Sequence, residues 1–410
     1  MNLKFNNKIK ALKNNSRDLV LLTDDIRNKV ILDLANNIEN AISEILFENH
    51  KDLLRMQPNN PMYDRLLLNE ERIKNIANDV KRVATLTSPL DKELEIKIMP
   101  NGLKITKKSV PLGVVAVIYE SRPNVTIDVF TLCFKSGNAC ILKGGKEASN
   151  TNIAFVKIIQ DTLKENDIVD CVLYLQNRED TAELIVCDLV DVCIPRGGTN
   201  LIKFVRENAR IPVIETGAGI CHCYFDEFGD LEKGKQIINN AKMRRVSVCN
   251  SLDVLIIHKK RLGDLYELVK SMENKVEIYA CPMAKVALEQ YKPLFKSKEQ
   301  DFKTEFLDYK MAVIVVNHIE RAITHINNVG TGHSETIVTE NDENANLFLK
   351  KIDAAAVYVN APTSFTDGGQ FGMGCEIGIS TQKLHARGPM GLEALTSHKW
   401  EIRGNGQIRK

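Results

Sequence analysis

Cys249 is the cysteine whose neighbours best suit nucleophilic chemistry. It stands in a polar segment of small residues directly before the apolar run 252–257, and Arg244 and Arg245 precede it. A nearby positive charge lowers the pKa of a thiol from its usual value of about 8.5 and so increases the fraction of nucleophilic thiolate. Free cysteine is more often a small buried hydrophobic residue, so the residues alone leave both a catalytic and a structural role open.

Two glycine-containing turns could hold the phosphates of a nucleotide. In one, Gly197 and Gly198 separate a short apolar run from a helical pattern, and in the other Lys143 and Lys146 flank a Gly-Gly pair. Glycines let a backbone approach a phosphate, and a helix N-terminus supplies N–H donors. The G-x-G-x-x-G fingerprint is absent, and each turn by itself could be a tight connection or a solvated loop. Together, the two turns argue for a dinucleotide more strongly than either does alone.

Three further segments carry groups that could serve a reaction. Asn124, after the apolar run 114–118, could donate its amide N–H to a developing oxyanion. Glu215 could place a carboxylate at a cleft, and residues 365–374, with four glycines, could surround a small anion with backbone N–H groups. The alternatives are a turn asparagine, a helix-capping glutamate and a flexible connector.

Composition and cysteine spacing exclude several classes of protein. The chain has 410 residues, enough for two or three domains, and its 55 basic and 53 acidic residues leave a net charge of +2. So small a charge does not favour nucleic acid or an anionic membrane. The ten cysteines form no C-x-x-C pair, and Cys221-His222-Cys223 has no second pair of ligands, so we expect neither a disulfide framework nor a metal site. The N-terminus lacks an apolar signal segment, which favours a cytoplasmic location.

Hydrophobic periodicity predicts helices first and α/β alternation afterwards. Helical spacing covers residues 26–45 and 70–84. Short β-branched runs, with helical stretches between them at 150–164 and 181–187, then follow at 114–118, 139–142, 172–175, 190–194 and 213–214. This alternation predicts a parallel, doubly wound sheet. A second α/β block is expected from about residue 241 to 359, with strands at 253–257, 311–316 and 355–359.

Residues 94–108 predict a β-hairpin that projects from the body. Apolar and polar residues alternate on both sides of Asn101-Gly102, the strongest short hairpin signal in a sequence. Lysines are frequent along its edge, as expected for an exposed strand edge that must not pair with the strands of other molecules. A surface hairpin and an oligomerisation arm both fit this pattern. The chain after Thr363 is glycine-rich, then amphipathic, and is expected to end in a short strand.

Taken in order, these segments resemble the aldehyde dehydrogenase superfamily and, within it, the γ-glutamyl phosphate reductase family. The resemblance covers nearly the whole chain and is carried by residues 110–124, 245–250, 367–374 and 380–395. The last of these runs is typical of the reductases rather than of aldehyde dehydrogenases in general. The resemblance implies an α/β, aldehyde dehydrogenase-like fold with a Rossmann-type cofactor domain, an α/β catalytic domain and a small β oligomerisation arm.

The same resemblance implies a reaction. It is the NADPH-dependent reduction of L-glutamyl 5-phosphate to L-glutamate 5-semialdehyde and phosphate, the second step of proline biosynthesis. Cys249 would attack the acyl phosphate carbon, expel phosphate and form a thioacyl-enzyme that accepts a hydride from NADPH. The Asn124 side chain and the Cys249 backbone N–H would form the oxyanion hole.

The resemblance also assigns cofactor-binding residues. Lys143, Gly197 and Gly198 match dinucleotide contacts of the superfamily. Lys146 falls near the position where NAD-preferring relatives carry an acid that binds the adenosine ribose, and a lysine there suits the 2′-phosphate of NADP. Glu305 resembles the glutamate that holds the nicotinamide ribose, although the Phe-Gly that usually follows it is absent.

For the substrate, the superfamily's anchor loop matches Asp367, Gly368, Gly369 and Gln370. These residues would bind the amino-acid end of the substrate, and Arg245 is a further substrate-binding candidate. Glu215 stands where hydrolytic aldehyde dehydrogenases keep the base that activates water. Reduction of an acyl phosphate needs no such water, so a role for Glu215 stays open.

The expected organisation has three parts. A helical region with the NADP-binding domain takes residues 1–93 and 111–240, the catalytic cysteine domain takes 241–360, and the hairpin, anchor loop and C-terminal segment take 94–110 and 361–410. Because such arms pair between subunits in this superfamily, at least a homodimer is expected. A glutamate 5-kinase would be a separate partner, and neither nucleic acid nor a membrane is expected.

Two alternatives remain for the function. One is a CoA-acylating or ordinary aldehyde dehydrogenase, against which the run 380–395 argues. The other is a non-catalytic scaffold, and the presence of Cys249, Asn124 and both glycine turns argues against it.

Overall fold

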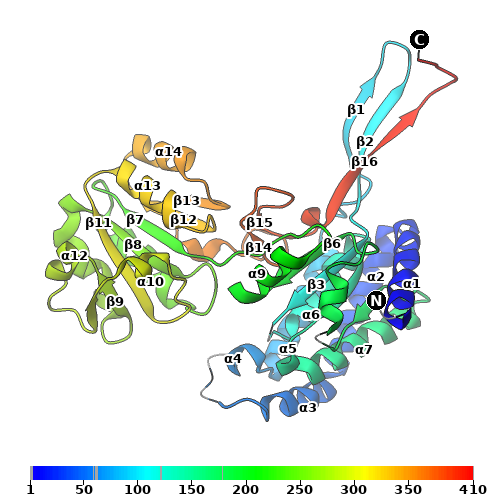
Figure 1. Cartoon of the computed structure of the whole chain (residues 1–410), viewed down its shortest axis with the longest axis horizontal. Coiled ribbons are helices and arrows are strands. Elements are labelled where there is room, and N and C mark those ends of the chain that lie inside the picture. The colour runs from blue at the N-terminus through cyan, green and yellow to red at the C-terminus, as the bar shows by residue number, and fades with distance from the viewer. Residues whose placement is uncertain (1–2, 59, 61–62, 121, 178, 410) are drawn as a thin grey trace. The chain divides into compact units, whose positions relative to one another are not determined.

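The computed structural model describes residues 3–58, 60, 63–120, 122–177 and 179–409. The chain divides into two compact units (Figure 1). Unit 1 comprises Met1–Thr216, Gly372–Gly378 and Leu384–Lys410, and unit 2 comprises Gly217–Phe371 and Ile379–Lys383. Each unit contains its own parallel sheet.

Unit 1 begins with helices α1 (Leu3–Asp18), α2 (Asp24–Asn40), α3 (Ile42–Leu53), α4 (Tyr63–Leu66) and α5 (Glu70–Thr85). The helix predicted at 70–84 is confirmed. The helical spacing at 26–45 belongs to two helices rather than one, because the chain turns at Ala41. Helix α2 packs on both α5 and α7, whereas α3 packs mainly on α7.

A four-stranded parallel sheet forms the centre of unit 1, in the order β5-β4-β3-β6. Its strands are β3 (Val114–Tyr119), β4 (Ala139–Lys143), β5 (Val172–Tyr174) and β6 (Val192–Arg196), and its helices are α6 (Asn124–Lys135), α7 (Ser149–Glu165), α8 (Glu179–Leu184) and α9 (Thr199–Asn208). The strand predicted at 190–194 lies two residues later. The strand predicted at 213–214 is wrong, because only Val213 forms a bridge, to Cys193.

The strand order places three turns at one edge of this sheet. The chain runs outward from β3 to β4 and β5 and then returns to β6 on the other side of β3. Ligands of open α/β sheets bind at the carboxyl ends of strands, where the order reverses. The turns at 119–124, 143–146 and 196–199 all follow those carboxyl ends.

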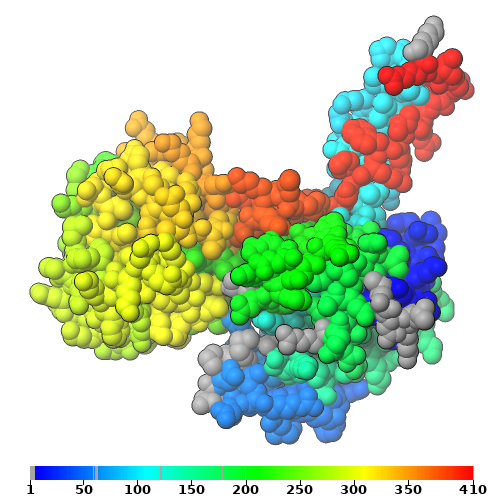
Figure 2. All heavy atoms as spheres, viewed as in Figure 1, coloured from blue at the N-terminus to red at the C-terminus, as the bar shows by residue number. Residues whose placement is uncertain are grey.

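A three-stranded antiparallel sheet forms an arm on unit 1 (Figures 1 and 2). Strands β1 (Glu93–Ile98) and β2 (Lys104–Pro111) form the predicted hairpin, with Ile98 opposite Lys104. The terminal strand β16 (Thr396–Arg403) pairs with the other edge of β2. The expected short strand near the C-terminus is thereby confirmed, and it completes the arm.

Unit 2 contains a seven-stranded parallel sheet in the order β10-β9-β11-β8-β7-β12-β13. The strands are β7 (Cys221–Phe225), β8 (Leu252–His258), β9 (Glu277–Ala280), β10 (Leu294–Lys296), β11 (Lys310–Val316), β12 (Ser334–Val338) and β13 (Ala356–Val359). The helices are α10 (Leu231–Met243), α11 (Leu265–Val269), α12 (Pro282–Ala287), α13 (Ile319–Val329) and α14 (Asp342–Lys351). Later in the chain, the short strand β14 (Ile379–Ser380) belongs to unit 2 and the short strand β15 (Gly388–Pro389) to unit 1.

The strands predicted at 253–257, 311–316 and 355–359 are confirmed to within a residue or two. The sheet starts before the expected residue 241, however, because β7 pairs with both β8 and β12. The sequence of β7 hid this strand, since its histidine and two cysteines look polar although all five residues are buried. Among the described residues, no helix has the length and apolar character needed to cross a membrane.

Candidate active site

Cys249 lies in the loop between α10 and β8 of unit 2, and its side chain is partly exposed. Seven of the other cysteines are fully buried: Cys133, Cys140, Cys171, Cys187, Cys193, Cys221 and Cys223. Burial raises the pKa of Cys193 and of Cys223 to about 12. The apolar runs around Cys133, Cys140, Cys171, Cys187 and Cys193 in the sequence are typical of core positions, and the structure confirms that these five residues are buried. Cys249 has the accessibility that a nucleophile needs, which Cys281 and Cys375 share.

The backbone of Cys249 is held by the residues that lead into β7. A Cβ atom on Gly219 would lie 1.7 Å from the Cys249 carbonyl oxygen, so only glycine fits there. Two residues later the Cys221 thiol donates to the same oxygen at 3.2 Å. The Gly219 N–H donates to Glu305 Oε1 at 2.9 Å, which brings Glu305 to this part of unit 2.

Asn250 ties the nucleophile loop to the segment that precedes the glycine-rich loop. The side-chain amide of Asn250 donates to the backbone carbonyls of Ser364 at 3.3 Å and Thr366 at 2.9 Å. The backbone carbonyl of Asn250 accepts from Thr363 Oγ1 at 2.8 Å. Asn250 is 5% exposed, so these bonds are shielded from water. The backbone of Cys249 is therefore held by the contacts of its own carbonyl oxygen and by the hydrogen bonds of the next residue, Asn250.

The predicted anchor residues form a closed turn at the end of unit 2. Asp367 Oδ1 accepts from the backbone N–H groups of Gly369 at 2.9 Å and Gln370 at 3.3 Å. Gly368 is buried, whereas Gly369 and Gln370 are exposed. Arg245 is also exposed, in the loop that carries Cys249.

A buried polar cluster near the amino ends of β7 and β12 was not predicted from the sequence. His222 and Glu335 are both fully buried, and His222 Nδ1 lies 2.8 Å from Glu335 Oε2. His333 is also fully buried; its Nδ1 atom lies 3.8 Å from the Cys221 sulfur, and burial lowers the pKa of His333 to about 4. Cys221 and His222 therefore have separate partners. Among the described residues no group of three or more potential metal ligands occurs.

In unit 1, Asn124 is the first residue of α6, directly after the carboxyl end of β3. Its side-chain nitrogen Nδ2 donates to Asp128 Oδ2 at 2.8 Å, one helical turn later. Glu215 Oε2 lies 3.5 Å from Arg206 Nη1 of α9, and the Glu215 side chain is 18% exposed. Asn124 therefore stands at the edge formed by the carboxyl ends of the strands, and Glu215 is engaged in an ion pair.

The two predicted phosphate-binding turns both lie at that edge of unit 1. Lys143 ends β4, its Nζ donates to the Gly144 carbonyl at 2.9 Å, and burial lowers its pKa. Lys146 is exposed on the turn that follows. Both turns belong to the edge at which the strand order reverses.

At the other turn, Gly198 caps α9 and its N–H donates to the Glu120 carboxylate at 2.8 Å. A carboxylate oxygen thus occupies the position where a phosphate oxygen would meet the helix N-terminus, which shows that this end of α9 attracts an anion. A Cβ atom on Gly197 would lie 2.6 Å from the Glu120 side chain. The residues present therefore fit a dinucleotide phosphate.

Comparisons with known proteins agree with this arrangement. The aldehyde dehydrogenase family model matches residues 302–400. γ-Glutamyl phosphate reductase of Legionella pneumophila is 58% identical over 416 aligned residues, which cover 100% of both chains, and that of Bacteroides thetaiotaomicron is 56% identical with the same coverage. The chain belongs to the γ-glutamyl phosphate reductase family.

Solved structures support the same family and fold. The crystal structure of γ-glutamyl phosphate reductase from Thermotoga maritima matches with a TM-score of 0.94 and 39% identity, covering 99% of this chain and 100% of that one. An acetylating aldehyde dehydrogenase from Geobacillus thermoglucosidasius matches with a TM-score of 0.72 at 18% identity, covering 99% and 98%, and shares the fold. The predicted aldehyde dehydrogenase-like α/β fold is confirmed.

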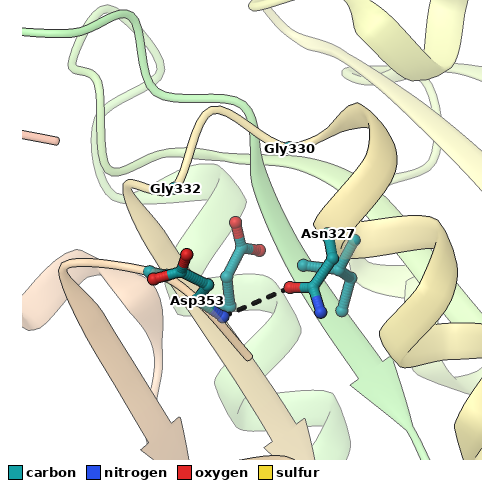
Figure 3. A pocket seen from close by; sticks show the side chains of 7 residues that line it. Asn327, Gly330, Gly332 and Asp353 are labelled. Carbon is teal, nitrogen blue, oxygen red and sulfur yellow. Dashed lines mark hydrogen bonds between the residues drawn. The ribbon is translucent and has the colours of Figure 1, made fainter. Parts of the chain in front are cut away.

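A pocket of about 240 Å³ in unit 2 does not contain the predicted site residues of this family member (Figure 3). Asn327, Gly330, Gly332 and Asp353 are among the residues that line it, and the Asp353 N–H donates to Asn327 Oδ1 at 3.2 Å. The reductase chemistry is therefore better sought at the Cys249 loop and at the edge of the unit 1 sheet than in this pocket.

Gly219→Ala should destabilise this reductase-family chain, because the new methyl group would meet a backbone oxygen that cannot rotate away. We expect the free energy of unfolding to fall by about 1–3 kcal/mol in guanidinium titrations. Gly263→Ala is the matched control, since nothing lies within 4 Å of its Cβ position. Equal stability of Gly219→Ala and the wild type would contradict the role given to Gly219.

Proposed function

We propose that this chain catalyses the reduction of L-glutamyl 5-phosphate to L-glutamate 5-semialdehyde and phosphate, the proline-biosynthesis reaction of its family. The observation that carries this proposal is the 58% identity, over the full length of both chains, to a protein named γ-glutamyl phosphate reductase. The partly exposed Cys249 on a tightly held loop supports it.

In this proposal Cys249 is the nucleophile. Its thiolate forms a bond to the acyl carbon, the carbon–oxygen bond to phosphate breaks, and phosphate leaves with that electron pair. NADPH, when bound, supplies the hydride that reduces the resulting thioacyl group. Collapse of the thiohemiacetal then releases the aldehyde and returns the electron pair to the Cys249 sulfur.

The carbonyl oxygen becomes negatively charged in both addition steps, so donors must meet it. We assign this role to the Asn124 side-chain amide and the Cys249 backbone N–H. Removal of one such donor costs about 3–4 kcal/mol of transition-state stabilisation in comparable sites. The bonds around Gly219 and Asn250 fix the Cys249 backbone before the substrate arrives, which lets its N–H act without reorganisation.

A nicotinamide cofactor would be held by unit 1 through its phosphates and by Glu305 of unit 2. Its phosphates fit the turn at Gly197 and Gly198, where the N-terminus of α9 already attracts a carboxylate. Lys143 lies at the end of β4, which is separated from β6 by β3 in the sheet. We propose NADP rather than NAD because Lys146 is exposed after β4, and a lysine there suits a 2′-phosphate. Glu305 would hold the nicotinamide ribose.

The amino-acid end of the substrate is assigned to the turn formed by Asp367, Gly368, Gly369 and Gln370, with Arg245 as a further contact. Gly369 and Gln370 are exposed, and their backbone N–H groups, which would meet an anion, donate to Asp367 Oδ1 in this structure. Glu215 stays outside the proposed mechanism, because Arg206 already engages it and the reaction needs no water-activating base.

We propose that unit 1 binds the phosphates of the cofactor and that unit 2 supplies the nucleophile and Glu305. The chain passes from unit 1 to unit 2 at residue 217, whereas the predicted cofactor domain extended to residue 240. A cytoplasmic location and a separate glutamate 5-kinase as partner remain predictions from the sequence.

The function is tested most simply in the reverse direction. With glutamate 5-semialdehyde and NADP⁺, the protein should form more than one equivalent of NADPH per chain only when phosphate is present, since phosphate releases the acyl group from Cys249. Cys249→Ser should abolish turnover and leave NADPH binding, measured by fluorescence, intact. Cys187→Ser is the matched control, because Cys187 is a buried core thiol.

Several outcomes would contradict this function. Turnover that ignores phosphate favours an ordinary aldehyde dehydrogenase, and CoA in place of phosphate favours an acylating one. No turnover with any acceptor favours a non-catalytic scaffold. Persistent turnover in Cys249→Ser would show that another group is the nucleophile.

Lys146→Ala should raise KM for NADPH by about tenfold and leave KM for NADH unchanged, because only NADPH carries the 2′-phosphate. Steady-state kinetics with both cofactors measure this difference. Lys164→Ala, which removes another exposed lysine of unit 1, should change neither value. An equal effect on both cofactors would remove Lys146 from the 2′-phosphate site.

The arm of unit 1 is proposed to pair with a second copy of the chain. It exposes Ile98 at 78%, Ile402 at 57% and Trp400 at 46%, more apolar surface than an isolated arm needs. Its outer strands β1 and β16 also have free edges in the three-stranded sheet.

The chain should therefore sediment as a dimer or a larger oligomer, and Ile98→Asp combined with Ile402→Asp should dissociate it, because charge is costly in an apolar interface. Leu54→Asp is the control, since Leu54 is 73% exposed directly after the end of α3 rather than on the arm. Monomeric sedimentation of the wild type would contradict this proposal.

A further inference from the structure

Asp128 lies directly beside Asn124 on helix α6. The two residues are four apart, and long side chains on a helix lean toward its N-terminus, so the Asp128 carboxyl points back toward Asn124. Asn124 Nδ2 donates to Asp128 Oδ2 at 2.8 Å. Nothing in the preceding mechanism uses Asp128.

The surroundings of Asp128 come from three other segments of unit 1. Arg196 at the end of β6, Glu376 and Asp79 of α5 are the charged groups that face it, and the neutral thiol of Cys375 lies in the same surroundings. Arg196 Nη1 also donates to the Glu376 carbonyl at 3.4 Å, which holds the guanidinium near this group. Arg196 offsets part of the negative charge that the three carboxyl groups bring together.

An ionised carboxylate can only accept hydrogen bonds, whereas a carboxamide has one donating and one accepting end. A charged Asp128 therefore selects the orientation in which the nitrogen of Asn124 faces it. In that orientation one N–H bonds to Asp128 and the second N–H stays available. The reversed orientation would place the two oxygens against each other.

We propose that Asp128 is a positioning residue, whose carboxylate fixes the Asn124 side chain with its second N–H available to the acyl oxygen of the substrate. This inference rests on the proposed function, because it concerns how Asn124 performs its part as oxyanion donor. Asp128 acts through Asn124 and contacts no reacting atom.

The arrangement has a pH dependence. Removal from water, the largest effect, raises the pKa of Asp128 to about 7, against the opposing influence of Arg196 and of the Asn124 hydrogen bond. Below that pH the carboxyl group is protonated and can donate to Asn124 Oδ1, which reverses the amide. Turnover should therefore fall as the pH drops below about 7, in addition to the loss caused by protonation of Cys249.

The test compares Asp128→Asn with the wild type in steady-state assays. We expect kcat to fall about tenfold or more with KM for the acyl substrate nearly unchanged, and the acidic ionisation near pH 7 to disappear. Asp170→Asn is the matched control. Asp170 is another carboxyl group of unit 1 whose pKa is raised by burial, and its replacement should leave kcat as it is.

A double-mutant cycle with Asn124→Ala separates positioning from a general structural role. If Asp128 acts through Asn124, Asp128→Asn should have no further effect on kcat when Asn124 is already alanine. An equal loss of kcat in both backgrounds, or a wild-type kcat in Asp128→Asn, would overturn the proposal.

A measurement on the wild type alone covers the case in which Asp128→Asn fails to fold. The pH dependence of kcat/KM is compared with that of Cys249 alkylation by iodoacetamide, followed by peptide mass spectrometry. Turnover should show one acidic ionisation that alkylation lacks, and a single shared ionisation would overturn the proposal. A wild type without phosphate-dependent turnover would refute the proposed function itself, whereas an active wild type with an unaffected Asp128→Asn would refute only the role of Asp128.

Discussion

The contact between the backbones of Gly219 and Cys249 is the constraint on which the rest of unit 2 depends. No side chain can be accommodated at position 219, because its Cβ would overlap the Cys249 carbonyl oxygen. The Cys221 thiol bonds to the same oxygen, and Asn250 bonds to the segment at 363–366. The loop is therefore held from three directions while the Cys249 side chain stays partly exposed. Such rigidity is what a preorganised nucleophile requires.

In unit 1 the candidate functional residues lie at the carboxyl ends of the strands, and in unit 2 they lie at the amino ends. In unit 1, Asn124, Lys143 and Gly198 follow the carboxyl ends of β3, β4 and β6, as ligand-binding groups of doubly wound sheets do. In unit 2, by contrast, Gly219 and Cys249 stand before the amino ends of β7 and β8. Carboxyl ends offer helix N-termini for phosphates, whereas the loops before β7 and β8 offer close backbone packing that fixes a thiol.

The sequence was informative wherever a local pattern decides the structure. Asn101-Gly102 predicted the hairpin, and β-branched runs predicted the buried strands β3, β4, β8 and β11. Polar residues hid β7 and β12, because His222 and Glu335 satisfy each other across strands more than a hundred positions apart in the chain. A local sequence pattern cannot predict that His222 and Glu335 will pair, because they are so far apart in the chain. The Asn124–Asp128 bond, by contrast, follows the four-residue spacing of a helix and could have been read from the sequence.

The proposal that Cys249 carries the acyl group is tested by trapping the glutamyl thioester on the Cys249 sulfur. The protein is mixed with glutamate 5-semialdehyde and NADP⁺ without phosphate, quenched in acid and digested for mass spectrometry. We expect the Cys249 peptide to gain the mass of one glutamyl group while one equivalent of NADPH forms per active chain. NADPH formed with Cys249 unmodified, or a glutamyl group on a different residue, would contradict this proposal.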